Sequence, residues 1–337
     1  MSTLPGRPRM LLLFVAVVVL AVLAKAYAAF NFYSEQQTRF MMDTYVSISA
    51  TGRQDVVPAA VSAALDRVQQ IAVKFSAQDP RSPVYAFNHE GRPLADKEIV
   101  SLIGRGLQIS QASGGAFDMT VEPLAELWGF YTKEPHLPED ADIRAALQGV
   151  GFRHLSLKDG ILTKDRPDVR IDLGGIAKGY ALVEAVKVLR TFGVTSAMVD
   201  AGGDVYVLGR KGARLWNIGI RQPRAEGIVG YVSVRDTAVM GAGDYERFFI
   251  KDGRRYHHIF NPSTGYPTEG VASVTLICDD PVVGQAWGKI PFVLGPHKGL
   301  EILSRIPGMD VIIILSSGER LYSQKLRHPL KVDPPQR

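Results

Sequence analysis

The order in which helical and strand patterns follow one another constrains the fold of this chain more than any other feature. Apolar residues recur every three or four positions in residues 61–75, 99–107 and 176–192, which predicts one helix in each range. β-Branched residues predict strands over Tyr45–Ala50, Ala197–Leu208, Trp216–Arg221, Val229–Val234, Ser273–Cys278 and Val311–Leu315. The elements are intermixed without a regular βαβ alternation, so we expect an α+β fold in which mixed sheets pack with helices.

The composition is that of a globular protein with a sizeable core. The chain has 337 residues, of which 46% are hydrophobic and 22% charged, enough for one large domain or two modest ones. A net charge of +5 is too small and too scattered to indicate a nucleic-acid partner. The one cysteine, Cys278, excludes an intramolecular disulfide framework and a metal site built from several cysteines.

Residues 1–28 have the features of a signal peptide or a membrane anchor. Arg7 and Arg9 precede an apolar run over residues 10–24, and small residues follow at the spacing that a signal peptidase recognises. The run is about 15 residues long, short of the roughly 20 that span a bilayer, although residues up to Phe30 could extend it into an uncleaved anchor. We therefore expect an exported protein that is periplasmic or anchored to the periplasmic face of the inner membrane.

The remaining chain divides into three parts. We expect a linker over residues 29–37, one folded domain over residues 38–326, and a loose tail over residues 327–337, where three prolines occur. No internal repeat or low-complexity stretch subdivides the domain.

Glycine is concentrated in four clusters, each of which contains an aspartate. The clusters are Ser113–Asp118, Asp172–Gly179, Asp200–Asp204 and Gly241–Asp244. In the second cluster we expect a short strand to end at Asp172 and a helix to begin with Lys178 in its first turn. Free amides, the helix dipole and the lysine charge together attract phosphate. Paired glycines also make ordinary tight turns, and that alternative stays open for any single cluster.

Among the seven histidines, His258 has the most suggestive context, because it lies where a strand runs into a turn rich in Pro and Gly. Strand alternation places His257 and His258 on opposite faces. A histidine at such a strand end can act as a general base or contact a nucleotide, and it can equally be structural. The residues alone therefore predict an exported α+β protein with a phosphate-bearing ligand.

At these same residues the chain resembles the ApbE family, the FAD:protein FMN transferases. The similarity extends over nearly all of residues 38–325 and preserves the order of the motifs. The shared residues are Met42, Thr44, Ser76, Ser82, Asn88, Gly115–Asp118, Thr120, Asp172–Tyr180, Gly202–Asp204, Trp216, Gly219, Pro223, Gly243–Tyr245, His258–Gly265 and Phe292–Gly295.

The resemblance implies a T-fold-like single large domain of two lobes and a magnesium-dependent enzyme. Such an enzyme transfers FMN from FAD to a threonine or serine hydroxyl of an exported or membrane redox protein and releases AMP. It also implies that His258 and Asp244 are catalytic and that the Gly175 carbonyl is a metal ligand. The residues that would bind the flavin nucleotide are Met42, Ala116, Phe117, Asp118, Asp172, Lys178 and Ile259.

Departures from the family pattern concentrate at the implied metal site. The family's late helix reads A-D-A-L-x-T, and its aspartate and threonine bind magnesium, whereas this chain has Gly284-Gln285-Ala286-Trp287-Gly288-Lys289. The aligned metal positions are therefore Gly175, Gln285 and Lys289. Gln285 offers only a neutral carbonyl to an ion that prefers anionic oxygen. Lys289 could stand in for the metal as a point charge on pyrophosphate.

Other departures surround the same region. Pro291, expected in the same helix, removes a backbone donor. Ala242 replaces a hydroxyl residue, Asn261 replaces an aspartate, and Gln78 replaces an aromatic residue near the flavin. Two functions follow as alternatives: a working FMN transferase, or a non-catalytic relative that binds FAD as a carrier, scaffold or maturation factor. A hydrolase that cleaves FAD without transfer and an unrelated exported binding protein are more remote alternatives.

Overall fold

The structure is a computed structural model that describes residues 14–20, 32–132, 134–324 and 326–332. Residues 14–20, inside the expected signal or anchor, form a short helix whose side chains are all exposed. The small residues of the expected cleavage site, at positions 24–28, lie outside the described residues. Within the described part, no helix combines the length and apolar character needed to cross a bilayer.

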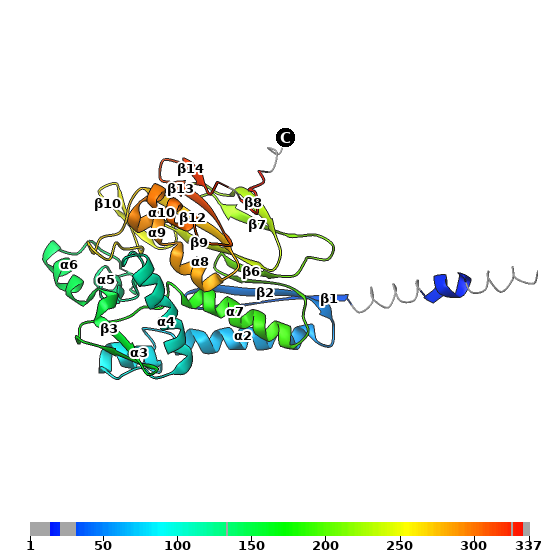
Figure 1. Ribbon diagram of the computed structural model, residues 1–337, viewed down its shortest axis with the longest axis horizontal. Coiled ribbons are helices and arrows are strands. Elements are labelled where there is room, and N and C mark those ends of the chain that lie inside the picture. The colour runs from blue at the N-terminus through cyan, green and yellow to red at the C-terminus, as the bar shows by residue number, and fades with distance from the viewer. Residues whose placement is uncertain (1–13, 21–31, 133, 325, 333–337) are drawn as a thin grey trace, which may run out of the picture.

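An eight-stranded sheet forms the centre of the molecule (Figure 1). In spatial order its strands are β1 (Phe32–Met41), β2 (Thr44–Arg53), β5 (Ser196–Ala201), β6 (Asp204–Leu208), β9 (Thr237–Gly243), β12 (Val271–Cys278), β13 (Met309–Leu315) and β14 (Arg320–Tyr322). Burial alternates along β5, whereas β12 is buried along its whole length because both of its faces are covered. The α+β class is confirmed, and every strand pair that the structure describes is antiparallel, where we expected mixed sheets.

The expected strand Ala197–Leu208 is two strands, β5 and β6, joined by a tight turn at Gly202 and Gly203. Both glycines have positive φ, 65° and 90°. A Cβ on Gly202 would lie 2.2 Å from Thr44 Oγ1, so only glycine fits there. The other five expected strands are confirmed with boundaries shifted by at most a few residues.

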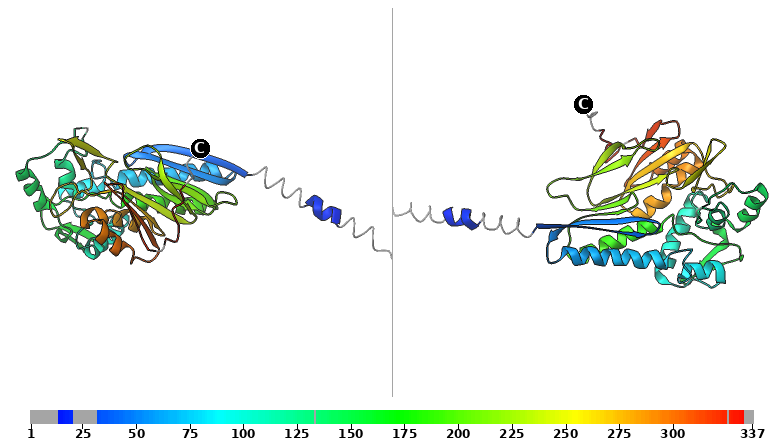
Figure 2. Two further views of the ribbon diagram at one scale, coloured as in Figure 1. Left: turned by 90° about the horizontal axis from the view of Figure 1, so that it is seen from above. Right: turned by 180° about the vertical axis from the view of Figure 1, so that it is seen from behind.

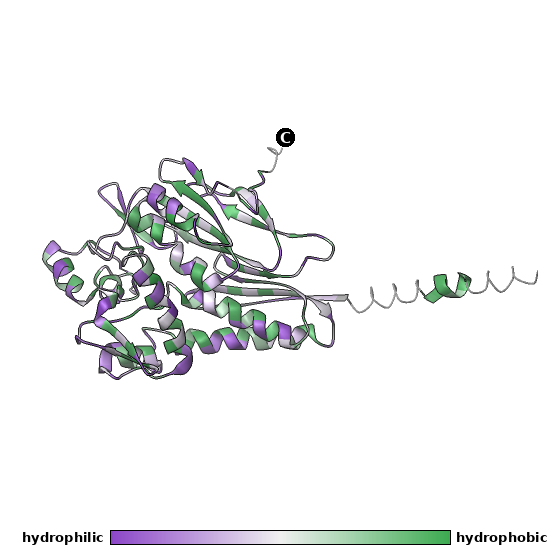
Figure 3. Ribbon diagram, in the orientation of Figure 1, coloured by the Kyte–Doolittle hydropathy of each residue, from purple (hydrophilic) through white to green (hydrophobic). Residues whose placement is uncertain are grey.

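Helices cover one face of the sheet (Figures 1 and 2). The helices α2 (Val57–Lys74) and α7 (Ala177–Thr191) pack against each other and against β1, β2, β5 and β6. Next to them, α8 (Pro281–Trp287), α9 (Ile290–Leu294) and α10 (Pro296–Leu303) cover β9, β12 and β13. Colouring by hydropathy shows apolar and polar residues interleaved along α2, as an amphipathic helix requires (Figure 3).

The helix α4 (Lys97–Ala112) is capped at its N-terminus by Asp96, whose carboxylate accepts the N–H groups of Glu98 and Ile99. All three helices expected from apolar spacing are therefore confirmed, as α2, α4 and α7.

The opposite face of the sheet is covered by the hairpin of β7 (Trp216–Arg221) and β8 (Ile228–Val234). Their inward residues pack on β6, β9, β12 and β13 in a second apolar cluster. A third cluster surrounds the fully buried Trp128. It joins α5 (Glu122–Leu127) and α6 (Asp140–Ala146) to the hairpin of β10 (Phe248–Lys251) and β11 (Arg254–His257). The remaining elements are α3 (Pro83–Glu90), β3 (Leu155–Lys158) and β4 (Ile161–Lys164), with single 3₁₀ turns at Leu147–Gly149 and Phe152–His154.

Both ends of the domain differ from expectation. The expected linker over residues 29–37 is in part a strand, because β1 begins at Phe32 and pairs with β2 along its whole length. The expected loose tail is held in place over residues 327–332. The buried carboxylate of Asp310 accepts the N–H groups of Arg327 and His328 at 3.0 and 2.8 Å, and Lys331 exchanges two backbone hydrogen bonds with Tyr231.

Candidate functional site

The second glycine cluster is an irregular turn that leads into α7. No strand ends at Asp172, contrary to expectation, because its carboxylate organises the turn instead: Oδ1 accepts the Gly174 N–H at 2.6 Å and Oδ2 accepts the Tyr131 hydroxyl at 2.6 Å. The helix begins at Ala177, which places Lys178 in its first turn as expected. The side chain of Tyr131 is a site residue that sequence patterns did not reveal, since only the fold brings it to Asp172.

The first cluster packs directly on this turn. A Cβ on Gly175 would lie 3.0 Å from the ring of Phe117, so the ring and the glycine backbone are in close contact. Asp118 is buried, and its oxygens accept bonds from the N–H and hydroxyl of Thr120 and from the N–H of Phe152 at 2.6 to 2.8 Å. Burial raises the pKa of Asp118 despite these donors. The aspartate therefore holds its own loop together, beside the buried Ala116 and Phe117.

An ion pair joins the second cluster to the third and fourth. Lys178 Nζ lies 2.5 Å from Asp204 Oδ2, and the Asp204 side chain is only 1% exposed. The other oxygen of Asp204 accepts the Gly241 N–H at 2.9 Å. Asp200 caps the intervening turn by accepting the Gly203 N–H. All four glycine clusters are thus brought together, which decides against four unrelated tight turns.

The β1–β2 turn adds Met42 to the same region. Met42 and Asp43 both have positive φ, 55° and 58°, a strained conformation for residues that carry a side chain. Thr44 follows directly and contacts Gly202, whose N–H donates to the Tyr45 carbonyl at 3.2 Å. Met42 therefore lies next to the third cluster.

The expected metal positions carry hydrogen bonds of their own. Gln285 Oε1 accepts the Gly179 N–H at 2.8 Å, and its Nε2 donates to the Gly174 carbonyl at 2.8 Å. Lys289 Nζ donates to the Gln285 carbonyl at 2.7 Å. We expected Pro291 in the same helix as Gln285, but it lies in the first turn of the separate helix α9. Its missing N–H costs nothing there, because the first N–H groups of a helix have no intrahelical partner.

These residues do not suit Mg²⁺. The one side-chain oxygen at the expected site, Gln285 Oε1, is already bonded to a backbone amide, and the Lys289 ammonium is bonded to the backbone carbonyl of the same residue. Burial lowers the pKa of Lys289 to about 8, with Lys178 acting in the same direction and Asp204 opposing it. In the described part of the chain, no group of three or more His, Cys, Asp or Glu side chains could hold a metal ion.

The two adjacent histidines differ in burial, and His258 lies just after the end of β11 rather than within the strand. His257 is buried; its Nε2 donates to the Thr268 carbonyl at 2.7 Å and its Nδ1 accepts the Ile259 N–H. His258 is half-buried, and its Nδ1 faces the Arg247 carbonyl at 3.4 Å, which leaves Nε2 with a lone pair. Burial lowers the pKa of His258 well below its usual value, and Arg247 and Lys289 act in the same direction, so its imidazole is neutral.

Asp244, the other expected catalytic residue, is already engaged. Both of its oxygens accept bonds from the guanidinium of Arg224, at 2.7 and 2.6 Å, and its side chain is 5% exposed. A carboxylate held in this way by a bidentate guanidinium fixes the position of its loop. Arg224 follows β7, 20 residues earlier in the chain, and no local pattern links the two residues.

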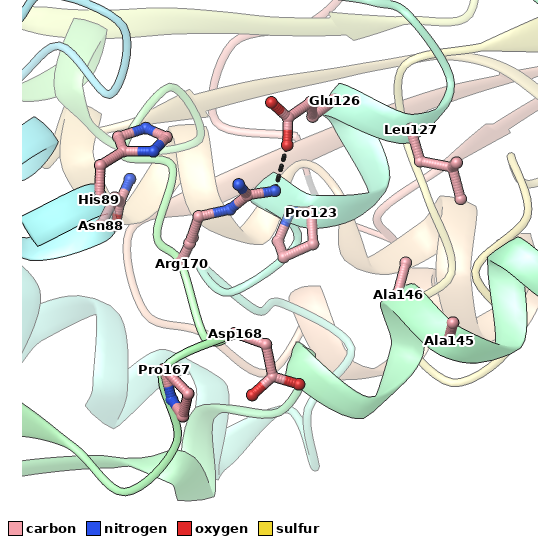
Figure 4. A pocket seen from close by; sticks show the side chains of 10 residues that line it. All are labelled: Asn88, His89, Pro123, Glu126, Leu127, Ala145, Ala146, Pro167, Asp168 and Arg170. Atoms are coloured by element: carbon pink, nitrogen blue, oxygen red, sulfur yellow. Dashed lines mark hydrogen bonds and ion pairs between the residues drawn. The ribbon is translucent and has the colours of Figure 1, made fainter. Parts of the chain in front are cut away.

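A depression with a volume of about 600 Å³ is lined in part by Arg170, two positions before Asp172 (Figure 4). None of the expected site residues lines it. Arg170 reaches from its wall to two glutamates, Glu126 at the rim and the buried Glu122, whose Oε2 is 2.5 Å from Arg170 Nε. Burial raises the pKa of Glu122 to about 7 even though Arg170 opposes the shift. This pair anchors, and so buttresses, the segment that leads into the Asp172 turn.

Comparisons with known proteins identify the family of this chain. The family model for the ApbE family matches residues 42–313. An FAD:protein FMN transferase of Treponema pallidum is 34% identical over 284 residues, which cover 76% of this chain and 78% of that protein. One from Klebsiella pneumoniae is 34% identical over 255 residues, covering 71% and 79%.

Solved structures show the same fold. The crystal structure of the ApbE protein of Thermotoga maritima superposes with a TM-score of 0.81 at 36% identity, over 87% of this chain and 97% of that one. The apo flavinyl transferase ApbE of Pseudomonas stutzeri gives 0.77 at 29% identity, over 87% and 95%. The fold and the arrangement of the glycine clusters define a flavin transferase class of protein. This chain belongs to the ApbE family.

Arg170→Ala should destabilise the protein by about 3 kcal/mol at pH 8, because it leaves the buried Glu122 carboxylate without its cation. Since the folded-state pKa of Glu122 is raised to about 7, the carboxyl is protonated at pH 5 and the loss should shrink there. Chemical denaturation at both pH values measures this. The control is Arg166→Ala, which removes an exposed pair with Asp168. Equal losses in the two variants would contradict the buttressing role.

Lys178→Ala should weaken FAD binding at least tenfold, because one charge-assisted contact to phosphate is lost at the start of α7. Flavin fluorescence quenching measures the affinity. The matched control is Lys187→Ala on the same helix, an exposed lysine paired with Glu184. An unchanged FAD affinity in a folded Lys178→Ala protein would contradict a phosphate-binding site at the start of α7.

Proposed function

We propose that this protein is an FAD:protein FMN transferase that uses the convergence of the four glycine clusters as its FAD site. The observation that carries the proposal is the position of Lys178, a cation in the first turn of α7 that is paired with the buried Asp204 at the point where the glycine clusters meet. The family membership supports the same activity, because the relatives named above are FAD:protein FMN transferases.

The chemistry requires one bond to form and one to break. A threonine or serine hydroxyl oxygen of the acceptor protein attacks the phosphorus on the FMN side of the FAD pyrophosphate. The bond from that phosphorus to the bridging oxygen breaks, and AMP leaves with the electron pair. The neutral imidazole of His258 takes the hydroxyl proton at Nε2, since Nδ1 faces the Arg247 carbonyl. Lys178 and Lys289 face the developing negative charge on the phosphates.

The remaining expected residues position these groups. Asp244 holds the loop before Arg247 through Arg224, and Asp172 holds the turn before α7. Phe117 packs on the turn, and together with Ile259 and Met42 in the same apolar cluster it would supply apolar surface for the isoalloxazine ring. We assign no step to magnesium, because the residues at its expected position do not suit it.

A non-catalytic FAD-binding or maturation factor is the second candidate. The pairing of Asp244 with Arg224 and the missing carboxylate at position 285 favour it. This alternative retains FAD binding and lacks AMP release, so one experiment distinguishes the two.

Incubation of the purified protein with FAD and a threonine-containing acceptor peptide should give a peptide adduct carrying FMN and an equal amount of AMP. His258→Gln should keep the FAD affinity and lower the transfer rate by about 10²- to 10⁴-fold, because it removes the base and keeps a polar side chain. Mass spectrometry and chromatography of AMP measure both products. A peptide with valine in place of threonine is the control. FAD binding without any adduct would favour the non-catalytic candidate.

We further propose that the protein works outside the cytoplasm, on an exported or membrane redox protein. The charged and apolar pattern of residues 1–28 supports this.

Alkaline phosphatase fused after Phe30 should be active in bacteria, because the segment before it directs the enzyme across the inner membrane, where its disulfides form. The same fusion lacking residues 1–28 is the control and should stay inactive. An inactive full-length fusion would contradict export.

A further inference from the structure

We propose that Lys289 takes the place of the divalent cation of this family, so that the protein binds the FAD pyrophosphate without a metal ion. The inference rests on the proposed function and concerns which groups supply positive charge to the FAD pyrophosphate. It starts from the mismatch between the residues at positions 285 and 289 and the magnesium ligands implied by family resemblance.

The position of Lys289 is the first argument. It follows α8 directly, and its Nζ donates to the Gln285 carbonyl at 2.7 Å, which fixes the ammonium near the Asp172–Gly179 turn that Gln285 contacts. Both members of the Lys178–Asp204 pair, and His258, lie within electrostatic range of it. An ammonium has three donors, and among the described residues Lys289 Nζ uses one of them, on the Gln285 carbonyl, which leaves two for phosphate oxygens.

Besides supplying charge, a bound metal ion would hold the turn in shape, and Gln285 performs this second role. Its amide bridges the Gly174 carbonyl and the Gly179 N–H, both at 2.8 Å, and its side chain is buried. These two bonds tie α8 to the start of α7, with the Gly175 carbonyl between their anchor points. The turn is therefore fixed by the chain itself and needs no ion as a template.

The net charge of the site is the third argument. An aspartate together with a divalent cation contributes one positive charge, and Gln285 together with Lys289 also contributes one. Asp204 is already balanced by Lys178. The two substitutions thus keep the field that the pyrophosphate meets, whereas a divalent cation added beside Gly175 would be repelled by the ammonium of Lys289.

The test measures FAD affinity by calorimetry in EDTA and in magnesium, for the native protein and three variants. The native protein should bind FAD equally well in both buffers. Lys289→Thr should lose at least tenfold in affinity in both, because one charged contact to phosphate disappears. The double variant Gln285→Asp/Lys289→Thr should bind FAD weakly in EDTA and recover in magnesium. Lys298→Thr, which removes an exposed lysine on α10, is the control and should match the native protein.

The outcomes distinguish a failure of the proposed role of Lys289 from a failure of the proposed transferase function. If magnesium raises the FAD affinity of the native protein tenfold or more, Lys289 does not replace the metal. The same conclusion follows if Lys289→Thr binds FAD as well as the native protein does. Either result leaves the transferase function in place. A native protein that binds FAD in neither buffer overturns the proposed function itself. A folded double variant, checked by circular dichroism, that gains nothing from magnesium also overturns the inference.

Discussion

The ion pair between Lys178 and Asp204 is the interaction on which the rest of the site depends. Asp204 is almost fully buried at the start of β6, and its charge would be costly there without the lysine from α7 and the Gly241 N–H from β9. The pair therefore fixes the first turn of α7 against the middle of the central sheet. Because Lys178 remains 27% exposed, it keeps some access to a ligand while it compensates the aspartate.

Around that pair, charge and shape are provided by separate sets of residues. The carboxylates of Asp118, Asp172 and Asp244 are bonded to protein donors and hold loops in position. Lys289 and His258 face the same region, one as an additional cation and the other as a neutral imidazole. Internal hydrogen bonds therefore hold these loops, and under our proposal they do so at the position where the family resemblance implies magnesium ligands.

Sequence patterns predicted the elements of the fold well and the connections less well. Apolar spacing located α2, α4 and α7 because each buries one face in the main apolar core. It could not separate β5 from β6, since the turn depends on the contact of Gly202 with Thr44 from another strand. The glycine clusters indicated the site, but Tyr131 and Arg224 were missed because their partners are distant in sequence. The role of Gln285 likewise emerged only from its two tertiary hydrogen bonds.

The central claim is that the FAD pyrophosphate is held by the chain's own cations at the start of α7. The most direct measurement is a crystal structure of the protein with FAD and Mn²⁺, with anomalous differences recorded at the manganese edge. The account predicts pyrophosphate oxygens within hydrogen-bond distance of Lys178 and Lys289 and no manganese peak beside the Gly175 carbonyl. A manganese ion bridging the pyrophosphate and that carbonyl, with Lys289 turned away, would contradict it.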